Sequence, residues 1–263
     1  MRIVALMENT TCREDLSCEH GLSLYIETGN KRILFDAGQS DTFAENAQKL
    51  GVDLTKVDIA VLSHGHYDHG GGFARFLELN QTAPVYLQRE AFAPHYNAVQ
   101  KYIGLDIGLQ QSGRLIFADE DVQLAPGIVL YISKSRAPQY PVESYGLSVL
   151  ESGTLYPDVF NHEQYLLIEE NGKRICISGC SHKGILNIME WFRPDILVGG
   201  FHFMKLNPDG DGAAALENAA QELLRYNATY YTGHCTGEAQ FVFLKERMGE
   251  HLHSLSTGTV MEL

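Results

Sequence analysis

The sequence predicts an α/β protein in which two packed β-sheets lie between outer helices. Short apolar segments recur along the whole chain, separated by glycines and polar turns, which is typical of strands. Helical patterns are spread between them, and the clearest covers residues 213–226, where leucines and alanines recur with the period of an amphipathic helix. No Pro- or Ser-rich linker divides the 263 residues, so we expect a single domain over residues 1–263.

The sequence pattern of residues 1–88 predicts five strands and two helices. Gly29-Asn30 is a turn signal that indicates a hairpin between 22–27 and 32–35. The continuous apolar run at 57–62 favours a strand buried on both faces. In chain order, we expect strands at 2–7, 22–27, 32–35, 57–62 and 85–88, and helices at 42–50 and 72–79.

The second part repeats this order of strands followed by alternating helices and strands. Asn171-Gly172 marks a turn between two strands. Residues 89–112 show no clear period, and we interpret them as an insertion or lid. Its Tyr96 and Tyr102 offer flat surfaces for a ring, with core packing as the alternative explanation of these aromatics. We expect strands at 114–117, 123–124, 128–133, 146–150, 165–169, 174–178, 195–199, 228–232 and 254–261, and helices at 183–192, 213–226 and 238–246.

The charge balance restricts the classes of partner. The chain carries 20 Lys and Arg against 33 Asp and Glu, a net charge of −13. This charge argues against nucleic acid and anionic membranes, so a small-molecule substrate is expected, with the oligomeric state left open. No apolar run approaches the ~20 residues of a membrane span. The five cysteines are an odd, scattered set without a secretory leader, which favours reduced thiols in the cytoplasm.

The segment SHGHYDHGGG, at 63–72, carries the strongest chemical signal. Residues two apart on an extended backbone point the same way, so His64 and His66 can bind one ion together. Asp68 and His69 fall where the chain turns toward a helix, and their direction suits a second ion. Imidazole with carboxylate favours Zn, Fe, Mn or Co over Ca or Mg. We therefore expect two divalent transition-metal ions, with Zn first and Mn or Fe as alternatives.

Here the sequence resembles the metallo-β-lactamase superfamily, whose hallmark is HxHxDH after a buried strand. The resemblance implies a four-layer αββα sandwich with the metal site along one edge of the two sheets. Asp36, in ILFDAG, matches the family's first motif. The resemblance implies that this acid orients the histidine loop from outside the metal site.

Two further strand ends carry histidines in ICISGCSHKG and YYTGHCTG. His234 matches the family's last ligand motif and is assigned to the second ion. Many members have a bridging Asp where Cys180 stands here. Either Cys180 or His182 replaces it, and we favour His182 because thiolate is a soft ligand in an N/O site; a small buried residue is the alternative for Cys180.

The remaining family ligand is expected just before the strand at 165–169. His162 and Glu163 both lie there, and either a ligand or a solvated pair fits the sequence. His202, in GGFHF, is expected to contact substrate or donate a proton, with a structural histidine as the alternative. The other histidines lack a strand-end pattern and are expected not to bind metal: His20, His95, His251 and His253.

The combined motifs resemble the branch that includes 7,8-dihydropterin-6-methyl-4-(β-D-ribofuranosyl)-aminobenzene-5′-phosphate synthase. We expect a metal-dependent hydrolase whose dinuclear site activates water against a small anionic metabolite, such as a phosphate ester or a pterin-related compound. Asp68 and His202 are the expected catalytic residues. The alternatives are a lactonase or thioesterase, or a non-hydrolytic redox or metal-binding protein.

Overall fold

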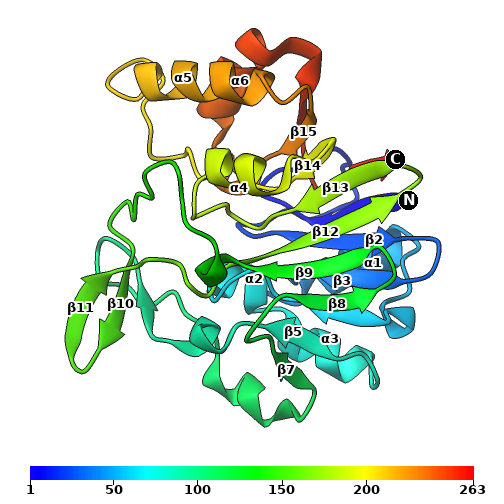
Figure 1. Cartoon of the computed structure of the whole chain (residues 1–263). Helices are drawn as coiled ribbons and strands as arrows, with labels where there is room; N and C mark the ends of the chain where they lie inside the picture. Colours follow the sequence, from blue (N-terminus) through cyan, green and yellow to red (C-terminus); the bar gives the residue numbers. More distant parts are fainter.

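The computed structural model describes all 263 residues and contains two large mixed β-sheets (Figure 1). The first has the strand order β17-β1-β2-β3-β4-β5-β7, and the second has the order β16-β15-β14-β13-β12-β9-β8. The first sheet comprises β1 (Arg2–Met7), β2 (Ser23–Glu27), β3 (Arg32–Phe35), β4 (Ile59–Val61), β5 (Val85–Leu87), β7 (Leu115–Phe117) and β17 (Val260–Glu262). The second comprises β8 (Val122–Ala125), β9 (Ile128–Ile132), β12 (Gln164–Glu170), β13 (Lys173–Ile177), β14 (Ile196–Val198), β15 (Thr229–Thr232) and β16 (Leu252–Ser254).

A small third sheet projects from the side of the molecule (Figure 1). It comprises β6 (His95–Tyr96), β10 (Ser148–Glu151) and β11 (Thr154–Pro157). The α-helices are α1 (Thr42–Lys49), α2 (Tyr67–Gly70), α3 (Phe73–Leu79), α4 (Ile185–Phe192), α5 (Ala213–Leu224) and α6 (Glu238–Met248). No helix combines the length and apolarity needed to cross a bilayer.

Three apolar clusters hold the layers together. Side chains from the inner faces of the two sheets pack against one another, with Phe35 and Leu166 fully buried among them. A second cluster joins the first sheet to α1 and α3, through residues such as Phe43 and Phe76. A third joins the second sheet to α4, α5 and α6, which lie together in Figure 1. The predicted four-layer αββα arrangement is confirmed.

The strand directions explain where polar residues gather. Strands β3, β4 and β5 run parallel in the first sheet, and β13, β14, β15 and β16 run parallel in the second. The carboxyl ends of parallel strands meet at one edge of a sheet, so the loops that follow β3, β4, β13, β14 and β15 lie close together. These loops carry the predicted polar residues.

Two sequence predictions of strands need correction. The single strand predicted at 254–261 is wrong: β16 ends in the second sheet and β17 belongs to the first. The backbone turns at Gly258, whose φ of 93° is readily adopted only by glycine, so one strand cannot continue through it. Strand β11 was not predicted; it pairs with β10 across the Ser152-Gly153 turn, and most of its residues are exposed.

We expect Leu166→Ala to lower the free energy of unfolding by about 2–5 kcal/mol, because it leaves a cavity between the two sheets. Urea unfolding followed by circular dichroism measures this change. Val242→Ala, at a position on α6 that is 59% exposed, is the matched control and should change the free energy by less than about 0.5 kcal/mol. Equal effects of the two substitutions would contradict the assignment of the core.

Candidate metal centre

Three histidine rings meet just beyond the ends of β4 and β13. His64 Nε2 lies 3.1 Å from His66 Nδ1 and 3.2 Å from His182 Nε2. All three side chains are buried. His64, His66 and His182 are called the first triad below. The first sheet supplies two of its members and the second sheet supplies the third.

A second group forms beside the first triad. His69 Nε2 lies 3.1 Å from His234 Nε2, while Asp68 Oδ2 lies 3.3 Å from His234 Nε2 and 3.8 Å from His69 Nε2. Asp68, His69 and His234 are called the second triad below. The ring centroids of His64 and His69 are 4.2 Å apart, so the two triads adjoin. The structure thus brings together all six residues that the sequence assigns to metal.

Asp36 anchors the histidine loop to the end of β3. Its Oδ1 accepts a hydrogen bond from the backbone N–H of Ser63 at 2.6 Å. Its Oδ2 accepts from Ser63 Oγ at 2.7 Å and from His69 Nδ1 at 2.6 Å. Because Nδ1 of His69 donates to Asp36, Nε2 is the ring nitrogen directed toward the second triad.

Other partners orient the rings in the same way. His64 Nδ1 lies 2.8 Å from Ser63 Oγ, and His234 Nδ1 lies 2.9 Å from Asn9 Oδ1. Ser63 Oγ donates its own proton to Asp36, so it accepts from His64. Donation through Nδ1 leaves Nε2 of His64 and His234 unprotonated and directed inward.

Strained backbone positions the side chains at several strand ends. Asp36, His202 and His234 have φ values of 59°, 57° and 46°, in the left-handed region that few non-glycine residues occupy. Asp36 directly follows β3, and the two histidines follow β14 and β15 after a short turn. Such strain clusters at functional sites because the surrounding packing must maintain it.

Burial lowers the pKa of His234 and of the three histidines of the first triad, whereas His69 differs from them. Burial lowers the pKa of each histidine in the first triad well below its ordinary value, and the neighbouring imidazoles lower it further. Burial also disfavours the charged form of His69, but the carboxylates of Asp36 and Asp68 outweigh it and raise the pKa of His69 to about 9. The first triad therefore offers lone pairs, and the second attracts positive charge.

This donor set fits two transition-metal ions. In the first triad three imidazole nitrogens face a common point at distances at which lone pairs repel one another unless a cation lies between them. In the second triad a cation would supply the positive charge that the carboxylates otherwise stabilise on His69. Cys180 lies between the groups, with Sγ 3.2 Å from His69 Nε2 and close enough to share a ligand set with His64. Both His182 and Cys180 thus reach the centre.

His162 and Glu163 are buried rather than solvated, and they support the centre from outside. His162 Nδ1 accepts a hydrogen bond from the backbone N–H of Gly65 at 2.8 Å, so its proton is on Nε2, which lies 3.3 Å from Asp158 Oδ2. Glu163 accepts hydrogen bonds from the backbone N–H groups of His182 and Lys183, at 2.7 and 3.0 Å. His162 therefore positions Gly65, which lies between two first-triad ligands, and Glu163 positions the backbone of the third, His182.

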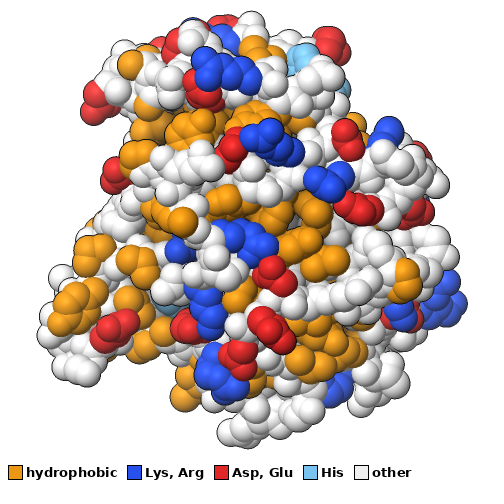
Figure 2. Space-filling view, in the orientation of Figure 1, with side chains coloured by type: hydrophobic (Ala, Val, Ile, Leu, Met, Phe, Trp, Pro, Cys, Tyr) orange, Lys and Arg blue, Asp and Glu red, His pale blue; other side chains and the backbone are white.

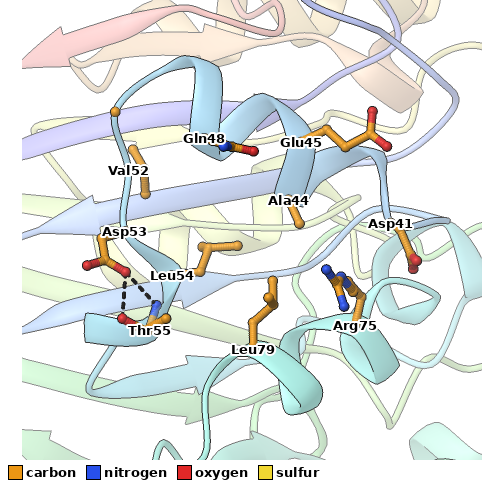
Figure 3. A pocket seen from close by; sticks show the side chains of 11 residues that line it. Asp41, Ala44, Glu45, Gln48, Val52, Asp53, Leu54, Thr55, Arg75 and Leu79 are labelled. Carbon is orange, nitrogen blue, oxygen red and sulfur yellow. Dashed lines mark hydrogen bonds between the residues drawn. The ribbon is translucent and has the colours of Figure 1, made fainter.

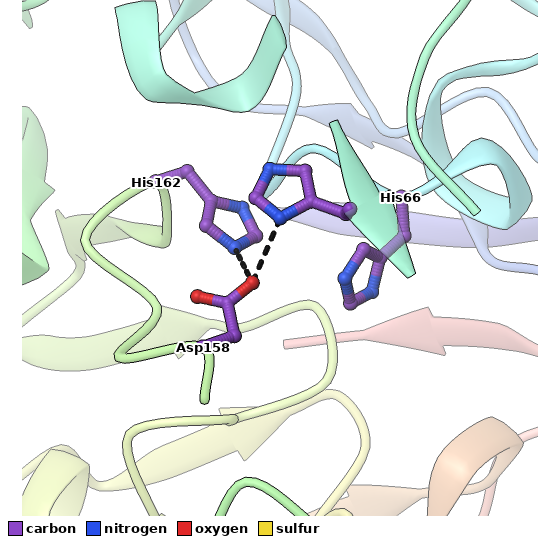
Figure 4. Close-up of side chains that lie close together, drawn as sticks. His66, Asp158 and His162 are labelled. Atoms are coloured by element: carbon purple, nitrogen blue, oxygen red, sulfur yellow. Dashed lines mark hydrogen bonds and ion pairs between the residues drawn. The ribbon is translucent and has the colours of Figure 1, made fainter. Parts of the chain in front are cut away.

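Asp158 lies next to the first triad and joins two histidines (Figure 4). Its Oδ2 accepts from His95 Nδ1 at 2.8 Å as well as from His162 Nε2. His66 belongs to the same cluster of potential ligand atoms. The proton on Nε2 of His162 leaves no lone pair for an ion there, so this cluster is a hydrogen-bond network beside the metal centre.

Sequence reasoning missed His20 and Asn9. His20 Nε2 lies 3.2 Å from Asp68 Oδ2, and this hydrogen bond raises the pKa of His20. Asn9 Nδ2 donates to the backbone carbonyl of His234 in addition to the ring contact described above. Neither residue follows a strand of the parallel groups, so the strand-end pattern gave no signal for them.

A cavity of about 210 Å³ opens onto both triads. His66, Asp68, His182 and His234 line it, together with His202, which was predicted to contact substrate. His251 and His253 do not line it.

Segment 89–112 contributes Asn97 and Ile103 to this cavity, whereas its lid role stays a prediction. Tyr96 and Tyr102 do not line the cavity. Their rings pack on each other at 5.6 Å, and the Tyr102 hydroxyl donates to the Leu105 carbonyl, so the prediction that they form a ring-binding surface here is wrong.

A larger cavity of about 520 Å³ lies between α1 and α3 (Figure 3). Its walls include Asp53, whose carboxylate accepts from the backbone N–H and the hydroxyl of Thr55, and Arg75. No residue of either triad lines it. Its size alone therefore does not make it the reaction site.

Comparisons with known proteins agree with this geometry. The family model described as the metallo-beta-lactamase superfamily matches residues 16–231. A Methanocaldococcus jannaschii protein named 7,8-dihydropterin-6-methyl-4-(beta-D-ribofuranosyl)-aminobenzene-5'-phosphate synthase is 28% identical over 273 residues, covering 93% of this chain and 90% of that protein. Another protein of that organism, MJ0448, is 30% identical over 211 residues, covering 77% of this chain and 80% of its own length.

A solved structure is also similar over the whole chain. It is that of Tm1679, described as a metal-dependent hydrolase of the beta-lactamase superfamily. The TM-score is 0.81 and the sequence identity is 28%, with 100% of this chain and 99% of that chain covered.

We expect Asp36→Asn to lower the affinity for metal about 10- to 100-fold, because the amide cannot hold both the Ser63 N–H and His69 Nδ1–H as the carboxylate does. Competition with a chromophoric chelator measures this affinity. Asp209→Asn, at an exposed carboxylate away from both triads, should leave it unchanged. Wild-type affinity in Asp36→Asn would refute the anchoring role.

Proposed function

The chain belongs to the metallo-beta-lactamase superfamily, and from this premise we propose that it is a metal-dependent hydrolase acting on a small anionic metabolite. The predicted family resemblance is confirmed. The observation that carries the proposal is the convergence of two adjoining triads on one open cavity. The resemblance to Tm1679 supports hydrolysis, since that protein is described as a metal-dependent hydrolase.

The two triads divide the ligand roles in this proposal. The first would hold one ion and the second another, with Cys180 as a further candidate between them. When bound, two such ions supply a water whose pKa is lowered toward ~7 and positive charge against the reacting oxygen of a substrate.

Side chains around the cavity supply the proton handling in this proposal. Asp68 and His20 form a hydrogen-bonded pair at the mouth, where the carboxylate orients the attacking water and the imidazole can take up a proton. His202 faces the same cavity beside His182, with 4.2 Å between the ring centroids, and we assign it to the leaving group. Proton donation from His202 would neutralise the oxygen that departs.

The surroundings of the cavity favour a small anionic substrate over a polymer. Lys205 lies at the wall and offers a positive charge outside the metal centre. On the face drawn in Figure 2, basic side chains are scattered among acidic and apolar ones. Together with the net charge of −13, this argues against an extended polyanion as partner.

The Methanocaldococcus jannaschii relative suggests which metabolites to test. Its name describes a synthase of a phosphate-bearing pterin compound. Phosphate esters and pterin-related compounds therefore come first in a substrate screen, followed by lactones and thioesters. Cytoplasmic localisation belongs to the same proposal and is supported by the five free cysteines.

Metal analysis tests the dinuclear proposal. Protein purified without chelator should contain two ions per chain by mass spectrometry of the metals, with Zn as the expected element and no visible absorbance. His64→Ala and His234→Ala should each reduce the content, since they belong to different triads. A full-length chain that binds a single ion, or none, would contradict the dinuclear proposal, while an iron chromophore would favour redox chemistry.

Asp68→Ala should reduce turnover of the best substrate at least about 100-fold while the fold survives, because the carboxylate holds both the second ion and His20. Steady-state rates with phosphomonoesters, phosphodiesters, lactones and thioesters provide the measurement, and circular dichroism monitors the fold. Asp209→Ala is the control at an exposed site. Normal turnover in Asp68→Ala would refute the mechanism.

A further inference from the structure

A second cavity, of about 240 Å³, adjoins the 210 Å³ cavity at the two triads and shares three of its residues. Tyr145, His182 and His202 line both. The ring centroids of Tyr145 and His202 are 5.5 Å apart, and those of His202 and His182 are 4.2 Å apart. The two cavities therefore meet at these three rings.

The second cavity differs chemically from the first. Most of its lining is apolar. The residues come from α4, α5, the loops that precede these helices, and the segment between β9 and β10. Helix α5 contributes Ala215 and Ala219, whose small side chains leave the space open. The apolar lining comprises Tyr140, Pro141, Tyr145, Ile185, Leu186, Phe201, Phe203, Leu206, Ala215 and Ala219.

The charged residues that line the two cavities indicate which end of a ligand each cavity would bind. Glu143 is the only carboxylate that lines the second cavity, and no lysine or arginine does, so an anionic group there would be repelled and unpaired. The 210 Å³ cavity at the two triads can attract an anionic group, because Lys205 and the proposed metal ligands line it. A ligand that spans both should carry its anionic group at the metal end, and the mostly apolar lining of the second cavity favours an uncharged group at the other end.

The residues that line both cavities have features typical of a ligand-binding site. Tyr145 and His202 both have left-handed φ values, 50° and 57°, although neither is a glycine. His202 Nδ1 is buried and has no hydrogen-bond partner. Backbone strain and an unpaired polar atom at one junction indicate that the packing holds these rings for a ligand rather than for stability.

We infer that the second cavity is a subsite for an uncharged aromatic group, bonded to the ester or phosphate that reacts at the metal centre. The inference names the substrate class of the proposed function and rests on it for the reacting end. The volume of about 240 Å³ is large enough for an aromatic ring, since a dry cavity of about 150 Å³ already accommodates benzene. Four aromatic side chains line the cavity and can pack against such a ring: Tyr140, Tyr145, Phe201 and Phe203.

Calorimetric titration with 1-naphthol, which carries the ring without an anionic group, tests the subsite separately from turnover. The wild-type chain should bind 1-naphthol with or without chelator treatment. Ala215→Phe should weaken binding at least tenfold by filling the subsite, whereas Ala214→Phe, on the same helix but outside the cavity, should leave it unchanged. The affinity of the metal-loaded protein for inorganic phosphate should be the same in the wild type, Ala215→Phe and Ala214→Phe.

The possible results separate the two proposals. Absence of 1-naphthol binding, or equal binding by Ala215→Phe, overturns the subsite. Binding that Ala215→Phe weakens upholds the subsite even if no ester is hydrolysed, in which case only the hydrolase proposal fails. If circular dichroism shows that Ala215→Phe does not fold, Phe203→Ala replaces it: weakened binding upholds the subsite, and unchanged binding overturns it.

Discussion

The carboxylate of Asp36 is the contact on which the rest of the centre depends. It is fully buried at the end of β3 and binds the backbone of Ser63, the hydroxyl of Ser63 and the ring of His69. A buried carboxylate is stable only when such donors surround it, so the strand end and the histidine loop fix each other. The orientation of His69, and through Ser63 that of His64, follows from this single group.

Burial determines the protonation state of the first triad, whereas neighbouring carboxylates determine that of His69 in the second. The first triad is kept neutral by removal from water, while two carboxylates concentrate negative potential at the second. In the proposed dinuclear centre, an ion at the first triad would meet neutral imidazoles, and an ion at the second would meet negative potential. The strained backbone at the strand ends indicates that folding supplies the free energy that holds these side chains in place.

The layered arrangement and the polar residues at the strand ends could be predicted from the sequence. Period and turn signals located most strands, and parallel strand ends predict a common edge, which is why His182 and His234 could be grouped with residues 64–69. Asn9 could not be grouped in this way, because it meets His234 across 225 positions of the chain through packing alone. Strand β11 was missed because its residues are mostly exposed, although the Ser-Gly dipeptide before it is a turn signal.

The composition of the first triad has a thermodynamic consequence. Two of its rings come from one sheet and the third from the other, so an ion bound there cross-links the two halves of the sandwich. Mass action would then make the melting temperature rise with the concentration of free metal, as for any ligand that binds only the native chain. Metal supply in the cell would accordingly influence how long the folded chain persists.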